Sequence, residues 1–88
     1  MLPDSRLEQL RRRVRKDPAS ILFAQLADEC RRAGLLDEAI DVCRAGLAHH
    51  PGYMSARVTL GRSLAGLGRW DAAQRELQAV LRAAPEHL

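Results

Sequence analysis

The chain has 88 residues, of which 47% are apolar and only 3% aromatic, so we expect one small helical domain with a limited core. No stretch approaches the roughly 20 apolar residues that span a bilayer, and the first residues do not resemble a signal peptide. We therefore expect a cytoplasmic protein with no membrane partner. The excess of arginine over lysine indicates a bacterial source. The net charge of +3 comes from residues 1–17, which hold six cations and three anions, whereas the charges of residues 18–88 cancel.

The first predicted helix covers about residues 6–16. Ser5, just before it, and Glu8, in its first turn, have the spacing of an N-terminal capping box. Its apolar residues form one stripe at helical spacing: Leu7, Leu10 and Val14. Pro18 should end this helix, because the residue before a proline avoids helical backbone. A second helix is expected at about 19–33, closed by Gly34 as a left-handed cap, and a third at about 37–49.

A fourth helix is expected at about 53–65 and a fifth at about 71–84, with Asp71 as its N-cap. The loops are short, so sequential helices should lie antiparallel. Small residues are predicted where paired helices approach most closely: Ala27, Ala39, Gly61 and Ala73. Larger apolar residues are predicted in the core: Phe23, Leu26, Ile40, Leu47, Leu60, Leu64 and Trp70.

A segment of the sequence is repeated with a fixed period. Residues 34–51 return 34 positions later as residues 68–85, with glycine, aspartate, alanine, leucine and proline in matching places. The halves before them match as well, since Leu26-Ala27 corresponds to Leu60-Gly61. Such a period indicates a repeat architecture, and on these residues the chain resembles the tetratricopeptide repeat family. The match is weakest at Arg57, which stands where the family usually has an aromatic residue.

The resemblance implies an all-α fold, a right-handed α-α superhelix of five antiparallel helices. Residues 1–17 would form an N-terminal half repeat that caps the stack, residues 18–53 the first repeat and residues 54–88 the second. The resemblance also implies a protein–protein interaction scaffold, which would hold a peptide or a segment of a partner protein on its concave helix face.

Polar residues on one side of the second and fourth helices are expected to line that concave face, opposite the core residues: Gln25, Asp28, Arg32, Thr59 and Arg62. Arginine can grip a carboxylate through two parallel hydrogen bonds. Members of the family that bind chaperones hold a peptide C-terminus with a Lys/Asn clamp. Those positions carry Ala24 and Asp28 in this chain, so that ligand is not expected.

An alternative function follows from the basic first helix. Arg12, Arg15 and Lys16 face away from its apolar stripe and could contact phosphates through salt-dependent interactions. This helix would then bind nucleic acid or an acidic partner. Nucleic acid is the less favoured partner, because no aromatic residues or base-reading motif accompany these cations, and cations in a last helical turn also complement the helix dipole.

Catalytic motifs are absent from the sequence. It has no nucleophile–base pair, no paired carboxylates and no glycine-rich phosphate loop, so we expect neither an enzyme nor a cofactor. Cys30 and Cys43 are expected in the core as free thiols, since a cytosolic protein rarely forms disulfides. The three histidines, His49, His50 and His87, do not have the spacing of a metal site.

The last helix carries Val80, Leu81 and Ala84 with no further helix after it. These residues could leave an apolar strip exposed. We therefore expect a monomer or a weak homodimer formed through the fifth helix, or alternatively a fragment whose exposed strip joins it to a longer repeat array.

Overall fold

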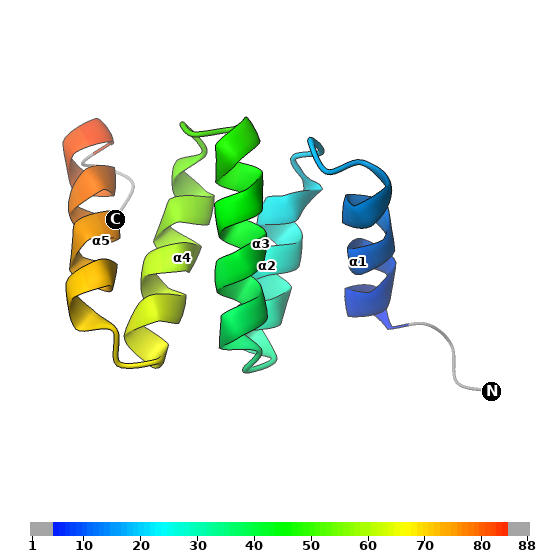
Figure 1. Ribbon diagram of the computed structural model, residues 1–88, viewed down its shortest axis with the longest axis horizontal. Helices are drawn as coiled ribbons and strands as arrows, with labels where there is room; N and C mark the ends of the chain where they lie inside the picture. The colour runs from blue at the N-terminus through cyan, green and yellow to red at the C-terminus, as the bar shows by residue number, and fades with distance from the viewer. Residues whose placement is uncertain (1–4, 85–88) are drawn as a thin grey trace.

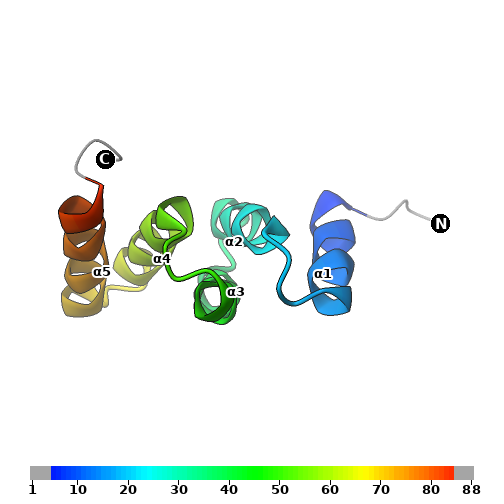
Figure 2. The same ribbon diagram turned by 90° about the horizontal axis from the view of Figure 1, so that it is seen from above.

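The computed structural model of the protein describes residues 5–84, and within that range every regular element is an α-helix. The helices are α1 (Arg6–Lys16), α2 (Leu22–Arg32), α3 (Leu36–His49), α4 (Met54–Gly66) and α5 (Trp70–Ala83). They follow one another along the molecule, each antiparallel to the one before it (Figure 1). Helices α2 and α3 overlap in that view but separate into two layers when seen from above (Figure 2). The predicted all-α stack of five antiparallel helices is therefore confirmed.

Helix α1 has the ends that the sequence predicts. The backbone N–H of Glu8 donates to Ser5 Oγ over 3.1 Å, which satisfies one of the free donors of the first turn. At the other end, the N–H of Asp17 donates to the Arg13 carbonyl over 3.1 Å, directly before Pro18. Both ends of helix α1 are thus capped by local hydrogen bonds.

Two glycines with positive φ, 34 residues apart, reverse the chain after α2 and α4. Gly34 has φ 81° and Gly68 has φ 77°, values that only glycine adopts without strain. After Gly34, the N–H of Leu35 donates back to the Cys30 carbonyl over 2.9 Å, and after Gly68 the N–H of Arg69 reaches the Leu64 carbonyl over the same distance. Both turns are Schellman motifs, so both helix pairs are joined in the same way.

Four helix starts differ from the prediction, and that of α4 lies one residue later than expected, at Met54. Helix α2 begins at Leu22, because Ser20 Oγ accepts the Leu22 N–H over 3.1 Å and the preceding residues form a turn. Helices α3 and α5 begin one residue earlier than expected, and the N-cap of α5 is Arg69. The prediction of Asp71 as an N-cap is therefore wrong: its carboxylate lies in the first turn of the helix, where it complements the positive end of the helix dipole.

The core is centred on Phe23, which is 1% exposed. Its ring stacks on His50 at a centroid distance of 5.9 Å and meets Tyr53 edge to face at 5.4 Å. The ring also lies so close to Gly46 that a Cβ atom there would be 1.9 Å from Phe23 Cδ2. Other residues predicted in the core are buried in the same cluster as Phe23: Ala27, Ile40, Cys43, Leu47, Leu60, Leu64 and Ala73. Three more are buried in a second cluster with Leu10 of α1: Leu26, Cys30 and Ala39.

The prediction that Trp70 lies in the core is wrong, because Trp70 is 68% exposed. Of the residues that could form an exposed strip on α5, Val80 is instead fully buried. Among the described elements α5 packs chiefly against α4, so only the side of α5 that faces α4 is covered. Val80 and Ala73 lie on that side, whereas Trp70 and Leu81 lie on the open side.

The second helix pair fills its interior differently from the first. Arg57 takes the place of Phe23, and its Nη1 lies 2.9 Å from Oε2 of Glu76, which takes the place of Val42. Its Nη2 donates to the Pro51 carbonyl over 2.9 Å. The second helix pair thus has a hydrogen-bonded ion pair where the first has the apolar residues Phe23 and Val42. A cation therefore fits at Arg57, the position of the weakest repeat match.

Within residues 5–84, no helix combines the length and hydropathy needed to cross a bilayer. Two residues used in the sequence interpretation, Pro85 and His87, lie outside the described residues.

Candidate functional site

Helices α2 and α4 are in direct contact and form the walls of a groove, hereafter the α2/α4 groove. It encloses about 510 Å³ and is lined by Ala24, Gln25, Asp28, Arg31, Arg32, Tyr53, Ser55, Val58, Thr59 and Arg62. All five residues predicted for the concave face are among them. The structure thus brings these residues together from two helices that are separated by the whole of α3.

The charges of the groove are unequal. Asp28 is its one carboxylate, and it is engaged on both oxygens: Oδ1 lies 3.0 Å from Arg31 Nη2, and Oδ2 lies 3.0 Å from Arg32 Nε. Arg62 occupies the position on α4 that Asp28 occupies on α2, one period of 34 residues earlier. No carboxylate among the described residues pairs with Arg62. The groove therefore has a cationic surplus, and Arg62 is its most available cation.

Thr59 contributes to the groove differently from the other four predicted residues. It is only 8% exposed, and its hydroxyl donates to the Ser55 carbonyl over 3.2 Å within α4. Its hydroxyl proton is thus already engaged, and Thr59 acts as part of the groove wall. Gln25 is exposed and is available to donate and accept hydrogen bonds through its amide.

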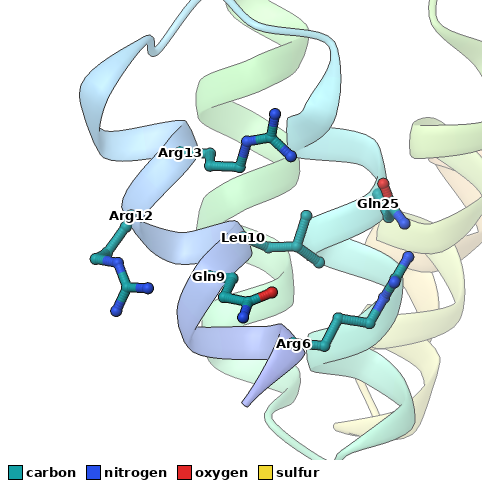
Figure 3. Close-up of a pocket in the computed structure, with 6 residues that line it drawn as sticks. All are labelled: Arg6, Gln9, Leu10, Arg12, Arg13 and Gln25. Atoms are coloured by element: carbon teal, nitrogen blue, oxygen red, sulfur yellow. The ribbon is translucent and has the colours of Figure 1, made fainter. Parts of the chain in front are cut away.

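A second hollow lies beside the first, between α1 and α2. It is lined by Arg6, Gln9, Leu10, Arg12, Arg13 and Gln25. Arg6 and Arg13 extend from α1 toward α2, where Gln25 lies (Figure 3). Since Gln25 lines both hollows, they are neighbours along one face of the molecule. Arg6 and Arg13 were not assigned to the site from the sequence, although their spacing of seven residues places both on one face of α1.

The basic face predicted on α1 divides into two parts. Arg12 lies at the edge of the α1/α2 hollow. Arg15 and Lys16 are exposed in the last turn of the helix and do not line that hollow. The structure therefore does not bring the three cations together around one cavity.

Helix α1 is held in place by an ion pair with α3. Arg11 Nε and Nη2 each lie 2.7 Å from an oxygen of Glu38, and Arg11 Nη1 also contacts Glu8. This two-point geometry is the strongest form of an arginine–carboxylate pair. Hydrogen bonding from Arg11 lowers the pKa of Glu38, and the hydrogen bonds to Glu38 and Glu8 raise the pKa of Arg11. No local sequence pattern predicts this pair, because its partners are 27 residues apart.

The two cysteines are buried free thiols, as predicted. Burial raises the pKa of Cys30 to about 11, with a further contribution from the charge of Glu38. Burial likewise raises the pKa of Cys43 to about 12, and its Sγ donates to the Ala56 carbonyl over 3.4 Å. Both thiols thus stay protonated at neutral pH, which makes them poor nucleophiles.

Replacing Glu38 with glutamine is expected to lower the melting temperature at neutral pH and to make the melting temperature less sensitive to a fall in pH. The pKa of Glu38 in the folded chain lies below its usual value of 4.5, so its charge stabilises the fold above that value. The stabilisation is lost as the pH falls through the lowered pKa. The difference in melting temperature between wild type and Glu38→Gln, followed by circular dichroism, should therefore shrink below pH 4.5. Asp41→Asn, on the exposed side of the same helix, is the control and should change little. A constant difference down to about pH 2 would contradict the assigned role of the charge.

Comparison with known proteins gives one match. A family model described as tetratricopeptide repeat matches residues 31–87. This range covers more than half of the chain and includes α3, α4 and α5. No curated protein and no solved structure matches.

Proposed function

Since the chain belongs to the tetratricopeptide repeat family, whose members are protein interaction modules, we propose that it holds a partner protein by binding an extended, carboxylate-bearing segment in the α2/α4 groove. The observation that carries this proposal is the charge of the groove. Arg31, Arg32 and Arg62 line it together with a single carboxylate, Asp28.

The groove offers a division of roles for such a segment. Arg62 has no carboxylate partner among the described residues and can take a partner's Asp or Glu side chain, or a C-terminal carboxylate, through two hydrogen bonds. Arg32 is oriented by Asp28 over 3.0 Å, which reduces the side-chain entropy lost when it binds. Gln25, Ser55 and Tyr53 add groups that donate and accept hydrogen bonds, which suits the backbone of an extended peptide.

The alternative function uses the exposed end of α1. Arg15 and Lys16 would contact an acidic protein or a nucleic acid there, with the strong salt dependence of phosphate contacts. We retain the proposed division of the chain into a cap at residues 1–17 and two repeats at 18–53 and 54–88. The cytoplasmic location and the bacterial source stay predictions from composition.

Replacing Arg62 with glutamate is expected to abolish selective peptide binding. The probe is a set of linear peptides selected from a random phage-displayed library on the immobilised wild-type chain, and we expect the selected peptides to be rich in Asp and Glu. Their affinity, measured by fluorescence anisotropy, should fall at least about tenfold in Arg62→Glu, because placing like charges together costs several kcal/mol and about 1.4 kcal/mol corresponds to tenfold.

The matched control is Arg15→Glu, which makes the same charge change on α1, outside the groove. It should leave the affinity within about twofold, since a distant exposed charge is largely screened. If Arg15→Glu and Lys16→Glu remove binding and Arg62→Glu does not, the groove proposal is wrong and the α1 alternative replaces it. Thermal melts of all variants establish that each is folded.

A further inference from the structure

An apolar surface, hereafter the α5 face, lies along α5 beside its contact with α4. Its residues are Trp70, Gln74, Leu77, Gln78 and Leu81, with Ala65 and Ala73 beside them. Trp70 is 68% exposed and Leu81 is 46% exposed. Residues of this size seldom stay in water when they are contiguous, and such a surface commonly marks an interaction site.

The internal repeat shows what kind of structure covers this face. One period earlier, the same positions on α3 are Leu36, Ile40, Cys43, Arg44 and Leu47. There the face is packed against α4. Leu36 lies against α4 so closely that a Cβ on Gly66 would be 2.7 Å from its Cδ1, and Cys43 Sγ donates to the Ala56 carbonyl. A surface that takes a helix in the middle of the molecule is therefore open on α5.

The open face is not a copy of the covered one. Gln74 stands where α3 has Ile40, and Gln78 stands where it has Arg44. An amide side chain both donates and accepts hydrogen bonds, so a row that is apolar at its ends and amide-bearing in its middle can pair with an identical row running the other way. That arrangement brings tryptophan against leucine at each end and amide against amide between them.

We propose that the α5 face is covered by the α5 face of a second copy of this chain, in a two-fold dimer with antiparallel α5 helices. Its charges favour that direction. Asp71 and Arg82 lie near opposite ends of α5 and on the same flank of the face, since eleven residues correspond to about three turns. Antiparallel packing sets Asp71 beside Arg82 of the second copy, twice by symmetry. Parallel two-fold packing would place the two copies of each residue on opposite flanks of the contact and would form neither pair. A closed two-fold contact of this kind is the commonest form of self-association.

The first test is the oligomeric state of the whole chain under reducing conditions. We expect light scattering and sedimentation equilibrium, from micromolar to millimolar protein, to give a monomer–dimer equilibrium. The emission of Trp70, the chain's single tryptophan, should shift to shorter wavelength over the same range as it leaves water. Leu81→Glu should lower the association constant at least about tenfold, because a charge would be buried without a partner.

The matched control is Leu35→Glu. Leu35 is 40% exposed, and the position one period later carries Arg69, so a charge is tolerated there. This variant should dimerise like wild type. A monomer at every concentration, or a dimer whose association and Trp70 emission are unaffected by Leu81→Glu, would overturn the proposal.

The second test concerns the direction of packing. Asp71→Arg should weaken the dimer, and the double variant Asp71→Arg, Arg82→Asp should restore it, because the exchanged charges again face their opposites. Recovery of association by the double variant is a coupling that only contact between these positions produces. If the double variant is as weak as the single one while its melt shows a folded chain, the antiparallel geometry is wrong.

Discussion

Replacing Gly46 with alanine is expected to cost about 3 kcal/mol of the free energy of unfolding, the upper end of what overpacking a core costs. A Cβ atom at this position would lie 1.9, 2.1 and 2.4 Å from three ring atoms of Phe23. The ring is held on two of its sides by His50 and Tyr53, which limits how far it can move away. The gain in helix propensity from glycine to alanine, about 1 kcal/mol, offsets only part of the clash. Urea denaturation followed by circular dichroism measures the difference.

Two other glycines serve as controls for Gly46. A Cβ on Gly52 would meet nothing within 4 Å, so Gly52→Ala should be neutral or slightly stabilising. A Cβ on Gly61 would lie 2.8 Å from Leu77 Cδ2. Leu77 is only half-buried and can swing toward the open side of α5, and the position one period earlier is Ala27. Gly61→Ala should therefore be tolerated far better than Gly46→Ala. Equal losses at the two sites would show that the contact with Phe23 does not set the cost.

Replacing Phe23 with alanine is expected to cost about 3–5 kcal/mol, the range for emptying an aromatic site in a core. Phe23 is the largest fully buried side chain among the described residues, and its ring fills the space left by Gly46. A chain of this size has a total stability on the order of 5–10 kcal/mol, so this single loss approaches the stability of the whole fold. Chemical denaturation at low temperature measures the loss, and Phe23→Leu should fall between wild type and alanine.

The control for Phe23 is an exposed aromatic side chain, that of Trp70. Trp70→Ala should change the stability of the monomer by less than about 1 kcal/mol, because an exposed ring gives up little buried area. The two variants therefore separate the aromatic residue that holds the fold from the one that lies on its surface. A larger loss at Trp70 than at Phe23, in dilute protein, would contradict the assigned core.

Most of the helical framework could be predicted from the sequence. The proline after α1 and the left-handed cap at Gly34 are local signals, and both describe the structure correctly. The five groove residues could be placed on one face for the same reason, since helical spacing determines which side chains share a side. Their actual state could not be predicted in every case: the hydroxyl of Thr59 binds the carbonyl of Ser55, four residues earlier, because a threonine in a helix can use either solvent or backbone.

The errors come from tertiary contacts. Trp70 is predicted in the core because the repeat pattern indicates which positions face a neighbouring helix. The pattern does not indicate whether such a helix is present. Arg57 is the weakest match to the repeat when its position is considered alone, but its charge is paired with that of Glu76 on the next helix. The same dependence on a facing residue explains Val80. Val80 stands one period after Gly46, which lies under the ring of Phe23. Since Arg57 replaces that ring in the second helix pair, a valine fits there and is fully buried.

The uneven filling of the two helix pairs has a consequence for motion. Helix α5 packs chiefly against one neighbour, and its pair is joined partly by the ion pair of Arg57 and Glu76, whereas the first pair closes around an aromatic ring. In a linear stack each unit is stabilised only by its neighbours, so opening begins at the two end helices, α1 and α5, each of which packs chiefly against one neighbour. Amide hydrogens of these two helices should therefore exchange first and those around Phe23 last. The protein loosens in time from its end helices inward, and a ligand that bridges α2 and α4 would slow that progression at its midpoint.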